Sequence, residues 1–325
     1  MVDKINAFPR LNRAYNTAFR PGALSLGLVV PLDAHGASPI PDMTQHIARS
    51  QLADSLGFAA LWLRDVPFNV PSFGDAGQMF DPFTYLGYLS GATRDIGLGV
   101  ASVILPLRHP AHVAKAAASA DQLSGGRLLL GVASGDRPEE YPALNQSYPD
   151  RDARFRDALS YIRAMSDTSP SYTGPHGRLM GEMDMLPKPV AARLPILITG
   201  GAQQSPEWVA AHGDGWITYP RDTAAQTQLT QAYRARSAAA GHTPKPVMQS
   251  LYIDLVADPD ADPQPIHLGF RAGTGFLTRY LRALQAGGLN HVALNLRFNT
   301  APIEDTMARL ADTLLPHFPT QKAET

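Results

Sequence analysis

Residues Pro195 to Trp208, with the sequence PILITGGAQQSPEW, set the pattern that this 325-residue chain repeats. The first five residues are an apolar run typical of a buried strand, and Gly200 and Gly201 follow it. Ser205 and Pro206 then begin a helix, because a serine side chain caps free backbone N–H groups and proline suits the first helical position. A strand that leads through glycines into a helix N-terminus forms a binding site for an anion, usually phosphate. A plain strand-to-helix turn has the same sequence pattern and is the alternative.

The same strand-and-helix unit recurs along the chain at intervals of about 35 residues. Strands are expected at residues 24–31, 59–65, 96–105, 127–133, 195–199, 215–219, 247–256 and 291–297. A helix is expected after each strand, at residues 41–57, 81–91, 110–123, 151–165, from 205 onward, 223–240, 275–286 and 303–318. Alternating strands and helices imply parallel pairing, and eight units predict an α/β protein with a single (β/α)8 TIM barrel and loop insertions on its rim.

The barrel domain is expected over residues 24–319, after an N-terminal surface arm of residues 1–23 and before a C-terminal tail of residues 320–325. The arm lacks the continuous apolar run of a secretion signal, and no apolar run is long enough to span a membrane. Active sites of these barrels lie at the carboxyl ends of the strands. Residues 200–205 are therefore at the functional end, after the fifth strand.

The composition excludes several classes of function. The net charge of -1 gives no electrostatic reason to expect nucleic acid or an acidic membrane as a partner. The absence of cysteine excludes disulfides, thiolate catalysis and cysteine metal sites, and with no targeting signal we expect a cytoplasmic protein. His109 and His112 are three residues apart, but no carboxylate pattern accompanies them, and His109 before Pro110 is better explained as a helix start, so no metal is expected.

Residues 97–131, GLGVASVILPLRHPAHVAKAAASADQLSGGRLLLG, carry a resemblance to a known family. They resemble the luciferase-like flavin-dependent oxidoreductases, which include bacterial luciferase and the alkanesulfonate monooxygenases. The shared pattern is a strand of small residues, Leu-Pro, His-Pro, a helix that ends in Asp-x-Leu-Ser-x-Gly-Arg, and a fourth strand. The likeness extends from about residue 24 to the C-terminal helix and includes Gly57-Phe58 and Gly213-Asp214-Gly215.

The resemblance implies where the phosphate of a flavin cofactor lies. In this family the flavin phosphate lies at the loop after the fifth strand. The implied ligands are mainly backbone N–H groups, together with the Ser205 hydroxyl, and they belong to Gly201, Ala202, Gln203, Gln204 and Ser205. Arg154, near the start of the fourth helix, matches a family arginine that pairs with the phosphate, a role for which the guanidinium fork is suited. A solvated surface arginine beside Arg151 and Arg156 is the alternative.

The resemblance also implies which residues lie near the flavin ring. Ala101 and Ser102 match the non-prolyl cis peptide of the family, although small residues in a strand also simply provide packing space. Ser134 falls where luciferase has an arginine near the ring, and Asp65 falls on an acidic family position. Val66 then stands where luciferase-type members have a histidine implicated in turnover, so that proton-transfer role does not carry over.

Three residues are candidates for catalysis: Asp65, Asp136 and Arg137. Asp136 and Arg137 follow the fourth strand on the active rim, where they either contact substrate or ring or are solvated loop charges. Arg297 ends the eighth strand at the same mouth. In the long loop after the second strand, Phe68, Phe73 and Phe80 either cover an apolar pocket or fasten the loop to the barrel.

The favoured function is a two-component monooxygenase. Reduced FMN, supplied by a separate flavin reductase, is expected to react with molecular oxygen and to oxygenate a small organic substrate, apolar or aromatic, while the protein orients the flavin and excludes water. One alternative is a hydride-transfer oxidoreductase of the same fold with a deazaflavin coenzyme. Another alternative is a flavin-binding protein without turnover, and the valine at position 66, where the resemblance implies a histidine, is consistent with it. Because family members commonly pair through barrel helices, a homodimer is expected.

Overall fold

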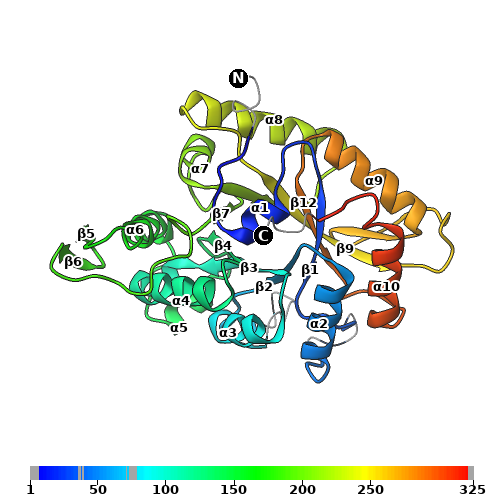
Figure 1. Ribbon diagram of the computed structural model, residues 1–325, viewed down its shortest axis with the longest axis horizontal. Coiled ribbons are helices and arrows are strands. Elements are labelled where there is room, and N and C mark those ends of the chain that lie inside the picture. Colours follow the sequence, from blue (N-terminus) through cyan, green and yellow to red (C-terminus); the bar gives the residue numbers. More distant parts are fainter. Residues whose placement is uncertain (1–6, 36–37, 39, 71, 73–78, 321–325) are drawn as a thin grey trace.

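The computed structural model of the chain describes residues 7–35, 38, 40–70, 72 and 79–320 (Figure 1). Eight parallel strands form a closed barrel, because each pairs with the next and β12 pairs with β1. Around the barrel these are β1 (Ser25–Val29), β2 (Ala60–Leu63), β3 (Gly97–Ile104), β4 (Leu128–Ala133), β7 (Ile196–Thr199), β8 (Gly215–Thr218), β9 (Val247–Leu255) and β12 (His291–Asn295). The prediction of a TIM barrel is confirmed.

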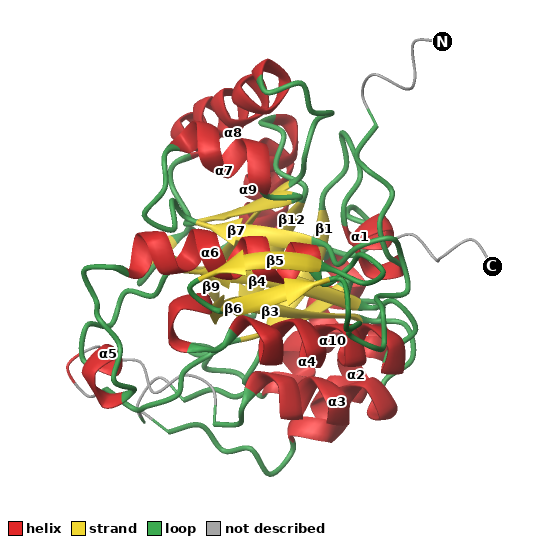
Figure 2. Ribbon diagram, turned by 90° about the vertical axis from the view of Figure 1, so that its left-hand side faces the viewer, coloured by secondary structure: helices red, strands yellow, loops and turns green. Residues whose placement is uncertain are grey.

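The helices lie outside the strands (Figures 1 and 2). They are α2 (His46–Leu56), α3 (Pro82–Ala92), α4 (Pro110–Leu123), α6 (Arg151–Ala164), α7 (Pro206–His212), α8 (Thr223–Ala239), α9 (Thr274–Ala286) and α10 (Ile303–Thr313), with a 3-10 turn at Leu105–Leu107 and the short α5 (Glu140–Ala143). Side-chain caps fix several starts: Asp81 accepts from two N–H groups of α3, and Ser205 accepts from Trp208. Helix α2 begins at His46, whereas the sequence predicts that it begins near residue 41.

Residues 8–19 close the bottom of the barrel, so the prediction of a surface arm is wrong for this part of the chain. Helix α1 (Arg13–Ala18) buries Tyr15 and Ala18 against inward-facing barrel residues such as Trp62 and Leu129. The Tyr15 hydroxyl donates to the Asp214 carbonyl at 2.6 Å, before β8. A six-residue helix carries too little periodic pattern to be recognised in the sequence. The division at residues 23 and 319 stays a prediction.

Two hairpins lie in segments that the sequence presents as loops. Strands β5 (Ser171–Gly174) and β6 (Gly177–Met180) form a separate hairpin that projects beyond α6 (Figure 1). Strands β10 (Gln264–Ile266) and β11 (Gly269–Ala272) extend the barrel sheet beside the end of β9. Gly269 is required there, because a Cβ at this position would lie 1.8 Å from the Tyr252 carbonyl oxygen.

A hydrogen-bonded chain crosses the floor of the barrel. The Trp62 indole donates to His291 Nε2 at 2.8 Å, so the imidazole proton lies on Nδ1 and is donated to Ser25 Oγ at 2.7 Å. Ser25 in turn donates to the carbonyl of Ala18 in α1 at 2.6 Å. Glycines make the space, because a Cβ at Gly99 would lie 2.4 Å from the Trp62 ring. The neutral imidazole therefore ties the N-terminal helix to the barrel.

Replacing His291 with glutamine is expected to flatten the pH dependence of stability. Burial lowers the pKa of His291 to about 3, whereas an unfolded histidine titrates near 6.5. As the pH falls below about 6.5, the unfolded chain binds a proton that the native protein does not, so this residue alone removes about 1.4 kcal/mol of stability per pH unit until about pH 3. Urea unfolding at pH 7.5, 6 and 5 measures both slopes, and equal slopes for wild type and H291Q would contradict the assignment.

Candidate functional site

A cleft of about 260 Å³ opens at the carboxyl ends of the barrel strands. Its lining brings together nine of the twelve predicted site residues: Asp65, Ala101, Ser102, Ser134, Asp136, Arg137, Gly201, Ala202 and Gln203. Val66, at the position where the resemblance implies a histidine, also lines it. Arg154, Gln204 and Ser205 are not part of this lining. Residues from four separate strand ends therefore converge on one site.

The loop after β7 forms the anion cradle at one side of the cleft. Gly200, Ala202 and Gln203 have φ angles of 56°, 46° and 60°, so three of four successive residues are left-handed. The backbone N–H groups of Gly201, Ala202 and Gln203 make no hydrogen bond to any residue that the structure describes. The Trp216 indole holds the loop by donating to the Gly200 carbonyl at 2.8 Å. Unused N–H groups on such a turn are what a phosphate requires.

The three predicted residues outside the lining are engaged elsewhere. The Ser205 hydroxyl accepts from the Trp208 N–H at 3.2 Å as the cap of α7. Gln204 fastens the loop to α6, where it accepts from Arg156 at 2.8 Å and donates to the Asp152 carbonyl at 3.0 Å. Arg154 donates to the Pro106 carbonyl at 3.1 Å.

Arg156 is thus the arginine of α6 that contacts the loop after β7. Residues two positions apart on a helix face in nearly opposite directions, so Arg154 and Arg156 do not share a face. The phosphate role that the resemblance implies for Arg154 stays a prediction.

Asp65 is held by a residue that the sequence analysis missed. Arg108 donates to both Asp65 carboxylate oxygens, at 2.7 and 2.9 Å, and the Ile104 N–H donates to one of them at 3.1 Å. Arg108 also donates to Asp81, the cap of α3, at 2.8 Å. The Asp65 side chain is 2% exposed. One guanidinium therefore joins the residues on either side of the long loop between β2 and α3.

The floor and wall of the cleft are formed by strand ends. The Ala101–Ser102 peptide bond is cis, as the resemblance implies, and the Ser102 and Thr199 hydroxyls are hydrogen-bonded across the floor. The buried Tyr141 hydroxyl donates to the carbonyl of Ser134 in the wall. Gly135 has a φ of 80°, and a Cβ there would lie 2.9 Å from the Tyr141 oxygen, so glycine is required.

Sequence reasoning did not select several residues that line the cleft, and four of these have polar or charged side chains: Arg64, Glu140, Thr199 and Tyr219. Arg64, Thr199 and Tyr219 stand at or next to the ends of their strands, which is the one signal that marks them. Glu140 is buried and its carboxylate lies 3.4 Å from the Arg137 guanidinium. Arg137 is likewise buried, so of the two alternatives for this residue the solvated loop charge is excluded.

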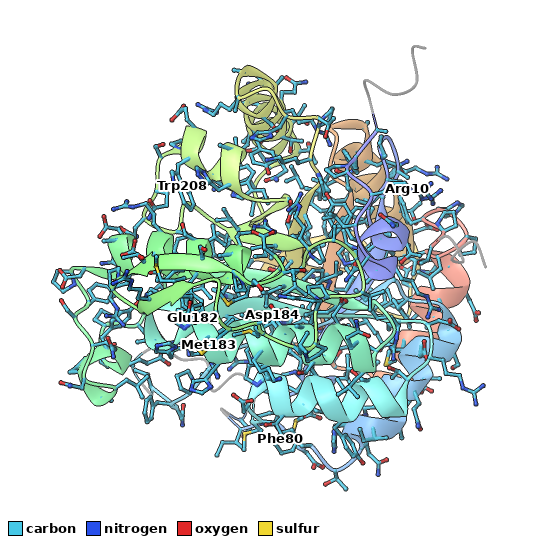
Figure 3. All side chains as sticks on the ribbon, turned by 60° about the vertical axis from the view of Figure 1, so that its left-hand side comes forward. Arg10, Phe80, Glu182, Met183, Asp184 and Trp208 are labelled. Carbon is cyan, nitrogen blue, oxygen red and sulfur yellow. The ribbon has the colours of Figure 1, made fainter. Side chains whose placement is uncertain are left out.

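The remaining candidates do not join this site. Phe68 and Phe80 are 40% and 41% exposed, and Phe80 lies at the outer edge beside α3 (Figure 3); Phe73 lies outside the described residues. The rings of His109 and His112 are 5.8 Å apart, and within the described ranges no cluster of three or more acidic or histidine side chains could hold a metal. Across the same ranges, no helix is long and apolar enough to cross a membrane.

The model of the family described as "Luciferase-like monooxygenase" matches residues 25–314 of the chain. The chain belongs to this family. An uncharacterized protein of Mycobacterium tuberculosis is 32% identical over 213 residues, which is 60% of this chain and 72% of that protein. The F420-dependent hydroxymycolic acid dehydrogenase of the same organism is 32% identical over 203 residues, covering 61% of this chain and 55% of that enzyme.

Solved structures of this family share the fold. The monooxygenase RslO1 of Streptomyces bottropensis superposes with a TM-score of 0.73 at 22% identity, over 90% of this chain and 99% of that one. The oxygenating constituent of 3,6-diketocamphane monooxygenase from Pseudomonas putida, solved in complex with FMN, gives 0.69 at 14% identity, over 92% and 100%. At these identities the likeness supports the TIM barrel, and the cofactor must be argued from the site.

Proposed function

We propose that this luciferase-like oxidoreductase binds a flavin-type cofactor, with the cofactor's phosphate at the Gly201–Gln203 loop and its ring over the Ala101–Ser102 floor. The proposal rests on one observation: the N–H groups of this loop make no hydrogen bond to other described residues. They lie at the edge of a cleft at the functional end of the barrel. Asp65, Ser102 and Ser134 would surround the ring. The bound cofactor supplies the redox chemistry, and the chain orients it and limits access of water.

The first candidate reaction is oxygenation of a small organic substrate with reduced FMN and oxygen. The cleft of this chain has Val66 where the resemblance implies a histidine. Oxygenation by reduced flavin depends less on a protein base than hydride transfer to or from an alcohol does. The flavin reductase that would deliver FMN, and a homodimeric assembly, remain predictions.

The second candidate is hydride transfer with the deazaflavin coenzyme F420. It is favoured by the 32% identity to an enzyme described as an F420-dependent dehydrogenase. A phosphate cradle formed by backbone N–H groups does not distinguish the two cofactors, because both carry a phosphate on the side chain of the ring.

Titration of the purified protein with FMN, reduced FMN and F420 separates the candidates. We expect saturable binding of one cofactor, followed by changes in its absorbance or fluorescence. Oxygen uptake with reduced FMN that increases with a substrate from an apolar and aromatic panel supports the monooxygenase, and substrate-dependent F420 reduction under anaerobic conditions supports the dehydrogenase. Binding with neither activity would support a flavin-binding protein without turnover. Failure to bind any of the three would overturn the proposal.

Replacing Gln203 with glutamate is expected to weaken cofactor binding at least tenfold. Gln203 is exposed and lines the cleft, so the substitution adds one negative charge beside the proposed phosphate with little change in shape. Added salt should reduce the defect by screening the repulsion. Gln203→Ala is the matched control, and it should keep near-normal affinity because the backbone N–H groups remain. Equal affinities of wild type and Q203E would place the phosphate elsewhere.

A further inference from the structure

We propose that Glu140 holds the exchangeable proton of this cleft and donates it to an acceptor atom of the bound cofactor or substrate. The inference rests on the proposed function, because the acceptor belongs to what the cleft binds. Glu140 begins the short helix α5 in the wall after β4, lines the cleft and is 3% exposed.

Among the described residues, three carboxyl groups line the cleft, and their surroundings differ. Asp65 accepts three hydrogen bonds, two of them from Arg108, so its carboxylate is already paired with a cation. Asp136 is exposed, so water solvates its charge. Glu140 combines burial with a longer contact of 3.4 Å to Arg137. This geometry distinguishes Glu140 from the other two carboxyl groups.

The groups that face Glu140 act in opposite directions. Burial raises its pKa, the positive charge of Arg137 lowers it, and the negative charges of Asp65 and Asp136 raise it again, with a net upward shift. Arg64 and Tyr219 line the same cleft from β2 and β8. A carboxyl group shifted upward retains its proton nearer to neutral pH, which is the property required of a general acid.

The proton step is balanced between Glu140 and the acceptor atom. The O–H bond of the neutral Glu140 carboxyl breaks, the proton moves to the acceptor atom, and the electron pair stays on the carboxylate. Arg137, 3.4 Å away, then stabilises the new negative charge. This arrangement supplies a proton-transfer group in a cleft where Val66 provides none.

Infrared spectroscopy of the cofactor-free protein tests the first half of the proposal. We expect a protonated-carboxyl carbonyl band that persists above the pH at which an ordinary glutamate ionises, and that is absent in E140Q. Arg137→Gln keeps Glu140 in place and should shift the titration of this band to higher pH, so the test does not depend on E140Q folding. A band unchanged in E140Q, or a titration that R137Q does not move, would overturn the proposal.

Cofactor affinity across pH 5.5–8.5 tests the second half, with FMN and F420 as the probes. We expect the wild-type affinity for the cofactor that binds to fall at least threefold as Glu140 loses its proton. E140Q, whose amide imitates the neutral acid, should show no such fall. Glu139→Gln is the matched control at the adjacent exposed glutamate and should follow the wild type. An E140Q profile like that of the wild type would overturn the proposal. If neither FMN nor F420 bound to any variant, the proposed function would be overturned, and the infrared result would decide the titration of Glu140.

Discussion

Replacing Arg108 with alanine should destabilise the protein by about 3 kcal/mol near neutral pH and weaken cofactor binding. The substitution leaves the Asp65 carboxylate, 2% exposed, with one N–H donor in place of three, and an unpaired buried charge has an energetic penalty of that order. It also releases Asp81 from Asp65, so the two residues that flank the loop between β2 and α3 are no longer joined. Denaturant unfolding and cofactor titration measure the two effects.

The pH dependence separates this explanation from a simple loss of packing. In R108A the unpaired Asp65 should take up a proton as the pH falls, so the stability difference from the wild type should shrink between pH 8 and pH 5. The double variant Asp65→Asn, Arg108→Ala removes the buried charge altogether and should be more stable than R108A alone. A stability difference that is constant with pH, together with no rescue in the double variant, would contradict the pairing.

Replacing Asp214 with asparagine should destabilise the barrel by about 3–5 kcal/mol. The Asp214 side chain is 4% exposed, accepts from Arg163 at 2.6 Å and from the Ile196 N–H at 2.9 Å, and also contacts Arg193. Asparagine keeps the shape but removes the charge that compensates Arg163. Because Tyr15 is bound to the carbonyl of the same residue, movement of Asp214 also loosens α1.

The arginines around Asp214 provide the matched comparison. The Arg193 side chain is 38% exposed, so Arg193→Ala should lower the free energy of unfolding by less than about 1 kcal/mol, as expected for a solvated pair. Urea unfolding of both variants at one pH gives the comparison. Equal effects of D214N and R193A would show that the buried charge at Asp214 does not determine stability there.

Several features of the site follow from local sequence patterns. The runs after Ala59 and Pro195 are largely apolar over four positions and end beside Arg64 and Gly200, and the longer run after Ile96 ends before Pro106, so the strands and their carboxyl ends are predictable. Asp81, His109 and Ser205 cap helices that begin immediately after them. Strand order in an eight-unit barrel then brings the residues after each strand to one rim. These patterns determined the fold and the functional rim, whereas Asp65, Ala101, Ser102 and Ser134 were selected because the chain resembles the luciferase-like family.

Other features depend on contacts between residues distant in the sequence. The Arg108–Asp65 pair joins positions 43 residues apart, and nothing in either neighbourhood identifies the partner. The choice between Arg154 and Arg156 depends on the rotation of α6 relative to the loop after β7. Helix α1 and the two hairpins are short segments, and burial or pairing with the rest of the chain, more than local propensity, stabilises them.

The sequence by itself determined the barrel, the functional rim and the resemblance to a flavin-dependent family, because strand and helix periodicity are properties of neighbouring residues. Only the tertiary structure decided that the Gly201–Gln203 N–H groups are left unused by the other described residues, that Asp65 is neutralised by Arg108, and that Glu140 is buried in the cleft wall. The state of an ionisable or hydrogen-bonding group depends on which charges and dipoles surround it in space, and folding alone determines those neighbours.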